Sequence, residues 1–354
     1  MRFRTLGNTG LTVSEIGFGT IPILSGDVPV LPEYHSPDVK TAVSIMQSAY
    51  DMGCNFFDTA GYDEYGDAEY KLGVFLQSVP REKIIVSDKV RKYTKEEMRK
   101  AVLASCDRLG THPDIYFVHQ VDERNADTVF SEDGALNALF ELKNEGVIRF
   151  TGIASHYYSV LERASLDPRV DVLQISGNIL ECGMLNRMKE NRAMIEKGVI
   201  LNKVYAAGLL TQEYTPEELI GGILHYPIAS ALIGIGTHEE AEAAMRREYA
   251  PCEIPFDDVF HYLSRRHDIV ACDRCQKCVC RYRHELFSIV RYFNYMQLGK
   301  EEWAKMHLRM YMAKVKKHCT GCKDKPCMSS CPQNLNFTEV LDRISEALEP
   351  QYPR

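Results

Sequence analysis

Polar side chains that could share acid–base work follow three consecutive apolar runs of the sequence. Asp58 lies in CNFFDTA, Lys89 in KIIVSDKV and His119 in DIYFVHQ, and a tyrosine, Tyr62 or Tyr65, comes shortly after the aspartate. A free phenol has a pKa of about 10, and a nearby ammonium favours its ionised form. A carboxylate keeps the ammonium charged and oriented, and a neutral imidazole can hydrogen-bond to a carbonyl oxygen and polarise it. The set suits protonation of an oxyanion as hydride arrives at carbon.

A second chemical pattern lies near the end of the chain, where eight of the twelve cysteines fall between residues 272 and 331. In a reducing compartment, clustered cysteines indicate a metal more often than disulfides. The spacings C-x2-C-x2-C and C-x3-C-P are typical of bacterial ferredoxins. The two groups are Cys272, Cys275, Cys278 and Cys280, then Cys319, Cys322, Cys327 and Cys331, which precedes Pro332.

The spacing also predicts which cysteines share an iron–sulfur cluster. In two-cluster ferredoxins the fourth cysteine of each run ligates the other cluster. We therefore expect two [4Fe–4S] clusters, one held by the first three cysteines of the first group with Cys331, the other by the first three of the second group with Cys280. A single cluster is an alternative, and so is structural zinc, which also takes four thiolates.

The elements that must position the acid–base residues form a regular alternation. Eight short apolar runs lie between residues 15 and 236, and helical patterns such as 39–53, 94–110 and 132–146 separate them. The runs are continuously apolar, as in parallel strands buried on both faces. Eight such units predict a (β/α)8 barrel, whose working residues lie at the C-terminal ends of the strands. A doubly wound sheet would need a G-x-G-x-x-G turn after the first strand, and GFGTIPILSG does not match it.

Two further segments extend this barrel. Residues 3–14 read as two short strands around Asn8-Thr9-Gly10, a hairpin that closes the N-terminal mouth of the barrel. After the barrel, residues 283–318 carry two amphipathic helical patterns between the cysteine groups. We therefore divide the chain into a barrel domain, 1–256, and a helical, ferredoxin-like iron–sulfur domain, 257–354.

Composition narrows the class of protein. The chain has 354 residues, 26% of them charged, and a formal net charge of -7, which argues against nucleic acid or an acidic membrane surface as partner. The N-terminus carries no signal-peptide pattern and no run approaches ~20 apolar residues, so we expect a cytoplasmic protein without a membrane anchor.

The first 250 residues resemble the aldo-keto reductases. The resemblance rests on LGNTGLTVSEIGFGT, FFDTA, YGDAEYKLG, VIRFTGIASH, QISGN and LIGIGTHEEAEAA. It implies an NAD(P)H-dependent carbonyl reductase whose catalytic tetrad is Asp58, Lys89, His119 and a tyrosine. Asp63 stands where the family usually has that tyrosine; we favour Tyr65, because YGDAE aligns with the family's helix start, and keep Tyr62 as the alternative. A subset of the family carries a ferredoxin-like C-terminal extension with a similar CPQN ending.

The resemblance also implies where the nicotinamide cofactor binds. The carboxamide would be held by Ser155, Gln174 and Asn178, and Tyr205 would pack against the nicotinamide ring. The loop that enters the helix after the eighth strand is a phosphate-binding candidate, because backbone N–H groups at a helix N-terminus bind anions; its residues are Gly234, Gly236 and Thr237. The acidic residues that follow, Glu239, Glu240 and Glu242, favour NADH over NADPH.

Three functions remain open from the sequence. The first is an oxidoreductase acting on a small-molecule aldehyde or ketone, or on the alcohol in reverse. The second is a redox-sensing regulatory protein that binds the cofactor without turnover. The third is an electron-transfer protein, in which the basic residues Arg309, Lys314, Lys316 and Lys317 could dock an acidic partner.

Overall fold

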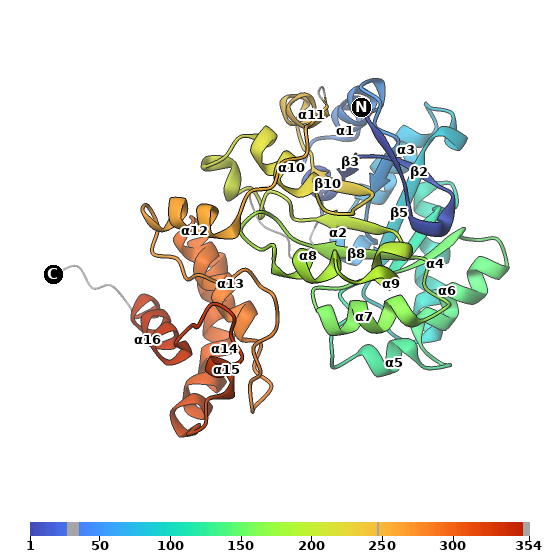
Figure 1. Ribbon diagram of the computed structural model, residues 1–354. Coiled ribbons are helices and arrows are strands. Elements are labelled where there is room, and N and C mark those ends of the chain that lie inside the picture. The colour runs from blue at the N-terminus through green and yellow to red at the C-terminus, as the bar shows by residue number, and fades with distance from the viewer. Residues whose placement is uncertain (27–34, 246–247, 350–354) are drawn as a thin grey trace. The chain divides into compact units, whose positions relative to one another are not determined.

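The computed structural model describes residues 1–26, 35–245 and 248–349 (Figure 1). The chain forms two compact units. The first contains residues 1–176, 188–204 and 216–252, and the second contains residues 177–187, 205–215 and 253–354. The division into continuous domains 1–256 and 257–354 remains a prediction; two segments from within the barrel sequence, 177–187 and 205–215, cluster with the C-terminal residues.

The first unit is a closed barrel of eight parallel strands, which confirms the predicted (β/α)8 fold. The strands follow chain order around the barrel, and the last pairs with both its predecessor and the first, so the sheet has no free edge. The barrel strands are β3 (Ile16–Gly19), β4 (Phe56–Asp58), β5 (Ile85–Val90), β6 (Ile115–Val118), β7 (Phe150–Ala154), β8 (Val172–Ser176), β9 (Val199–Asn202) and β10 (Ser230–Gly234).

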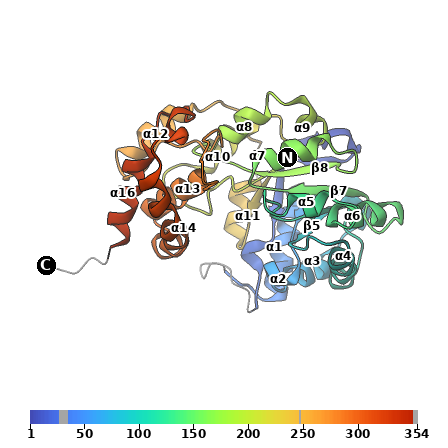
Figure 2. The same cartoon turned by 90° about the horizontal axis from the view of Figure 1, so that it is seen from below.

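Helices surround the barrel strands, as two perpendicular views show (Figures 1 and 2). Neighbouring helices pack against one another in the order α11, α1, α3, α4 and α6. The helices between residues 39 and 245 are α1 (Val39–Asp51), α2 (Tyr62–Tyr65), α3 (Ala68–Leu76), α4 (Lys95–Leu109), α5 (Ala126–Phe130), α6 (Ala135–Asn144), α7 (Tyr158–Leu166), α8 (Gly183–Met188), α9 (Arg192–Glu196), α10 (Pro216–Leu224) and α11 (His238–Met245). Short 3-10 turns lie at Gly7–Thr9, Ile21–Ile23, Arg81–Lys83 and Leu210–Gln212.

Helix α4 shows why these segments start and stop where the sequence predicts. The Thr94 hydroxyl accepts a hydrogen bond from the backbone N–H of Glu97, the pattern of an N-cap. At the other end Gly110 adopts a left-handed conformation with φ of 63°. Glycine reaches that conformation without a steric penalty, so it ends the helix and turns the chain into β6.

The N-terminal hairpin is present and closes one end of the barrel. Strands β1 (Phe3–Thr5) and β2 (Thr12–Ser14) pair antiparallel. Leu6, Leu11 and Val13 are buried in one cluster with residues near the starts of the barrel strands, including Phe56 and Ile115. The hairpin therefore fills the N-terminal mouth with apolar side chains and leaves the C-terminal end for chemistry.

The second unit is mainly helical. Its helices are α12 (Phe256–Ser264), α13 (Leu286–Gln297), α14 (Glu301–Gly321), α15 (Pro326–Ser329) and α16 (Phe337–Leu348). Helices α13 and α14 are the two predicted between the cysteine groups. Apolar side chains of α13, α14 and α16 form one buried core that includes Phe293, Leu308 and Ile344. None of the helices in the described ranges is long and apolar enough to cross a membrane.

Candidate active site

The centre of the candidate site is a buried ion pair between two neighbouring strands. Asp58 ends β4 and Lys89 lies near the end of β5, with both side chains almost fully buried. The Lys89 ammonium bonds to Asp58 and, at 2.7 Å, to the backbone oxygen of Thr59. The other carboxylate oxygen of Asp58 accepts from Ser87 Oγ at 2.6 Å and from Gln174 Nε2 at 3.0 Å. Asp58 is therefore held by side chains of two other strands, β5 and β8, and it fixes Lys89.

The structure brings Tyr65 to this ion pair. Lys89 Nζ lies 5.2 Å from the centroid of the Tyr65 ring. Tyr62, at the other end of α2, is 51% exposed and lines a cavity between α2 and α4. The arrangement favours Tyr65 over Tyr62 as the residue that works beside Lys89.

The surroundings of Tyr65 keep its phenol protonated. Burial raises the pKa of Tyr65 far above its usual value, and the negative charges of Asp58 and Glu64 raise it further, against a smaller opposite effect of Arg91. The sequence predicted that the lysine would favour the phenolate. In the structure, burial and the neighbouring carboxylates hold the pKa of Tyr65 far above its usual value, so its phenol keeps its proton.

His119 lies at the end of β6 and has a partner that the sequence did not predict. Its Nδ1 hydrogen-bonds to Glu64 Oε2, and its backbone N–H donates to the Val90 oxygen at 3.0 Å. Burial lowers the pKa of His119; Glu64 opposes that shift, while the charges of Lys89 and Arg91 add to it. His119 is therefore mostly neutral at pH 7.

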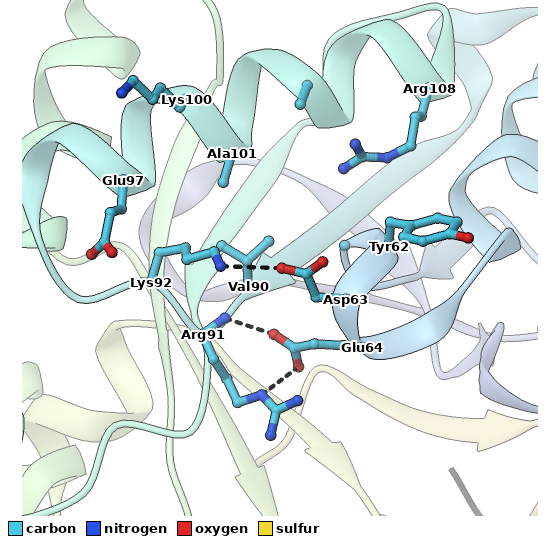
Figure 3. Close-up of a pocket in the computed structure, with 12 residues that line it drawn as sticks. Tyr62, Asp63, Glu64, Val90, Arg91, Lys92, Glu97, Lys100, Ala101 and Arg108 are labelled. Atoms are coloured by element: carbon cyan, nitrogen blue, oxygen red, sulfur yellow. Dashed lines mark hydrogen bonds and ion pairs between the residues drawn. The ribbon is translucent and has the colours of Figure 1, made fainter. Parts of the chain in front are cut away.

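Glu64 is the buried acid of this group. Its Oε1 accepts from the backbone N–H of Arg91 at 2.6 Å, and Arg91 Nε lies 3.4 Å from Oε2 (Figure 3). Burial disfavours its charge, but the bond to His119 and the charges of His119 and Arg91 outweigh this, so the pKa of Glu64 lies below its usual value. The only sequence signal was an acidic residue directly before Tyr65.

A cavity of about 540 Å³ adjoins Glu64 and lies between α2, the end of β5 and α4. Figure 3 shows Asp63 and Lys92 paired at this cavity, with Lys100 and Arg108 on α4 above them in the view. The Asp63–Lys92 pair is 3.1 Å apart. Because Lys100 and Arg108 also pair with glutamates, the cavity wall carries compensated rather than free positive charge.

The predicted cofactor-binding residues Gln174 and Ser155 lie on β8 and directly after β7. Gln174, on β8, donates to Asp58, and its Oε1 is buried with no hydrogen-bond partner among the described residues. An unsatisfied buried acceptor is costly, so this oxygen is suited to an amide N–H of a ligand. Ser155 is already engaged, since its hydroxyl donates to the Val121 oxygen at 2.6 Å.

The predicted phosphate loop also has a local partner. Gly234 ends β10, and Gly236 and Thr237 lead into α11. The N–H of Gly236 donates to Glu240 Oε2 at 2.7 Å, and the N–H of Glu240 donates to Thr237 Oγ1 at 3.1 Å. An anion-binding N–H group is therefore present, and a carboxylate of the same helix holds it.

Asn178 and Tyr205 fall within the second compact unit. Asn178 is fully buried, and its side-chain oxygen accepts from the N–H groups of Leu180 and Glu181 at 3.0 and 2.9 Å. Tyr205 is partly buried in the turn that follows β9. In the structure Asn178 thus shapes its own loop.

The eight clustered cysteines all belong to the second unit and carry free thiols. Cys327 and Cys331 are part of its buried core, and Cys272, Cys278, Cys280 and Cys319 pack against it. Within the described ranges, no three His, Cys, Asp or Glu side chains converge closely enough to hold a metal ion. Iron–sulfur clusters therefore stay a prediction.

The comparisons with known proteins all point to the same family. The aldo/keto reductase family model matches residues 15–222. L-galactose dehydrogenase of Arabidopsis thaliana is 33% identical over 61% of this chain and 69% of its own. NADH-specific methylglyoxal reductase of Escherichia coli (strain K12) is 28% identical over 60% of this chain and 71% of its own. The fold matches that of an aldo-keto reductase from Bacillus halodurans in its holo form, with a TM-score of 0.60 and 23% identity over 78% of this chain and all of that one.

The buried ion pair gives a stability prediction. Lys89→Met leaves the Asp58 carboxylate buried without its counter-charge, so the free energy of unfolding should fall by about 3–5 kcal/mol. Lys92→Met, which removes an exposed ion pair on the same segment, should cost no more than about 1 kcal/mol. Urea denaturation of both variants measures the difference. Equal, small losses would show that Asp58 does not depend on Lys89.

Proposed function

Because the chain belongs to the aldo/keto reductase family and is an NAD(P)H-dependent oxidoreductase, we propose that Asp58, Tyr65, Lys89 and His119 carry its reaction. The reaction is reduction of a small aldehyde or ketone to the alcohol, or its reverse. The observation that carries the proposal is the buried Asp58–Lys89 pair with the Tyr65 ring 5.2 Å from the ammonium.

Each residue has a role that follows from its surroundings. A bound nicotinamide supplies or accepts the hydride. The neutral phenol of Tyr65 donates its proton to the oxygen of the reduced carbonyl. The Lys89 ammonium stabilises the phenolate that this leaves, and Asp58 holds the ammonium in place. His119 hydrogen-bonds to the same substrate oxygen and orients it.

The residues around β8 and β10 support a nicotinamide cofactor. The Oε1 of Gln174, which has no hydrogen-bond partner among the residues that the structure describes, could accept from the N–H of a carboxamide. Ser155, Asn178 and Tyr205 remain proposed contacts by family resemblance. At the start of α11, Gly234, Gly236 and Thr237 offer a phosphate site once Glu240 moves off the Gly236 N–H.

The same helix start favours NADH over NADPH. Glu239, Glu240 and Glu242 place three acids on α11, where an additional phosphate would meet repulsion. NADH-specific methylglyoxal reductase is also one of the relatives. The substrate class is a small carbonyl compound or its alcohol, in keeping with the relatives named for methylglyoxal and L-galactose.

For the C-terminal residues 257–354 we propose an iron–sulfur domain with two [4Fe–4S] clusters. Support comes from which thiols raise one another's pKa beyond the larger effect of burial. The charge of Cys278 raises the pKa of Cys272 and of Cys275, and that of Cys331 raises the pKa of Cys278. In the second set, Cys322 and Cys280, the predicted crossing ligand, raise the pKa of Cys319 and of Cys327. These neighbours support the predicted crossed ligand sets, although Cys327 also raises the pKa of Cys278.

The clusters would act first as structural pins. The two cysteine groups lie on separate segments of the chain, and cysteines of both pack on the core of α13, α14 and α16. A metal centre with ligands from both groups would therefore tie both segments to that core. One cluster or structural zinc would do the same. A second role is electron transfer to an acidic partner protein. The exposed basic residues Lys316 and Lys317 on α14 would favour docking of such a partner.

The proposed reaction predicts cofactor consumption. Loss of NADH absorbance at 340 nm should occur with at least one member of a panel of small aldehydes, ketones and 2-oxoaldehydes, and NADPH should be used less well. NADH binding, followed by fluorescence, without consumption across the panel would support a sensor instead.

Removal of one hydroxyl group at a time distinguishes the roles of Tyr62 and Tyr65. Tyr65→Phe should lower kcat for carbonyl reduction by about 10²–10⁴-fold, since it deletes the general acid. Tyr62→Phe is the matched control and should leave kcat within about twofold, because Tyr62 is half exposed. The reverse pattern would assign the proton to Tyr62.

The cluster proposal predicts metal content. Anaerobically purified protein should contain ~8 iron and ~8 sulfide per chain and give an EPR signal on reduction. Cys278→Ser should lose about half of the iron, whereas Cys252→Ser, which removes a solitary exposed thiol, should lose none. Zinc in place of iron would mean a structural zinc domain.

A further inference from the structure

Glu64 connects three parts of the active site. It lies in α2 directly before Tyr65, and its side chain is buried. One carboxylate oxygen accepts from the backbone N–H of Arg91 at 2.6 Å, and the other bonds to Nδ1 of His119. Each oxygen thus has its own hydrogen-bond partner, which must donate, and Arg91 Nε lies 3.4 Å from the oxygen that bonds to His119.

This contact fixes the tautomer of the imidazole. A carboxylate has no proton to give, so the proton in the contact belongs to Nδ1 of His119. In the neutral ring the remaining nitrogen, Nε2, then has a lone pair and no proton. Neutral His119 can therefore accept a hydrogen bond through Nε2, but it can donate one there only as the imidazolium.

The sequence had suggested a neutral histidine that donates to a carbonyl oxygen. The structure points elsewhere, because a carbonyl offers only an acceptor and so needs a proton on Nε2. An alcohol, in contrast, offers its hydroxyl proton to the bare nitrogen. The two forms of His119 consequently match the two forms of the substrate.

We propose that Glu64 is a positioning residue that holds the His119 proton on Nδ1, so that neutral His119 selects the alcohol and the imidazolium selects the carbonyl. The proposal rests on the proposed function for the role of His119 at the substrate oxygen. Glu64 acts through His119 and does not replace Tyr65 as the proton donor.

The charges around His119 set the direction of its pH response. Glu64 from α2 faces it, with Lys89 on β5 and Arg91 just after β5; Asp58 on β4 pairs with that lysine. Burial and the two cations lower the pKa of His119, against the effect of Glu64. Carbonyl reduction should therefore be favoured on the acidic side of this pKa and alcohol oxidation on the basic side.

Glu64→Gln tests the proposed tautomer directly, because the backbone N–H of Arg91 sets the orientation of the new amide. The Arg91 N–H requires an acceptor, so the amide oxygen takes the place of Oε1. The amide NH2 then takes the place of Oε2 and donates to Nδ1 of His119. Neutral His119 is thereby forced to carry its proton on Nε2, the opposite tautomer.

The first readout is the ¹⁵N NMR spectrum of histidine side chains, assigned by comparison with His119→Asn. We expect the Nδ1–H tautomer in the wild type and the Nε2–H tautomer in Glu64→Gln. Asp63→Asn is the matched control, because Asp63 is an exposed acid of the same helix, and it should leave the wild-type tautomer. An Nε2–H tautomer in the wild type overturns the proposal even if Glu64→Gln does not fold.

The second readout is the pH profile of kcat/KM. In the wild type, reduction should fall by about tenfold per pH unit above the pKa of His119, while oxidation rises and levels off. In Glu64→Gln, reduction should lose that decline, whereas Asp63→Asn should keep it. Identical profiles in wild type and Glu64→Gln contradict the inference. A protein without turnover would contradict the proposed function alone, since the tautomers are measured without substrate.

Discussion

The burial of two opposite charges, Asp58 and Lys89, is the constraint on which the rest of the site depends. An ammonium without water must have partners, and Lys89 finds them in a carboxylate and in the backbone oxygen of Thr59. The carboxylate needs donors in turn and takes them from Ser87 and Gln174. Residues from β4, β5 and β8 are thus held together, which a closed barrel can do because its strand ends meet in one ring.

Burial and two acids keep the phenol of Tyr65 protonated. Burial raises its pKa most, and the charge of Asp58 raises it further. Glu64 adds a second negative charge with the same effect, and Arg91 opposes the three only in part. The two acids divide the work, one serving Lys89 and the other His119.

The sequence predicted the barrel, its hairpin and the two helices between the cysteine groups, because each depends on local patterns of apolar residues, caps and glycines. It also predicted that Asp58 and Lys89 meet, since both end neighbouring strands. It did not predict the bond from Glu64 to His119, because that contact joins α2 to β6 and leaves no periodic trace in the sequence. Nor did it predict that Gln174 would hold Asp58 while its own oxygen finds no partner in the described part of the chain.

The start of α11 also shows what the sequence alone cannot predict, for a physical reason. Glycine and threonine before a helix indicate exposed N–H groups that attract an anion, but they do not say which anion. In this chain Glu240, three residues into the helix, reaches back to the N–H of Gly236. In the proposed function, a phosphate would have to displace that carboxylate, which would stay nearby as a negative charge with Glu239 beside it. An additional phosphate on the ligand would add to the repulsion, which is the physical reason for proposing NADH rather than NADPH.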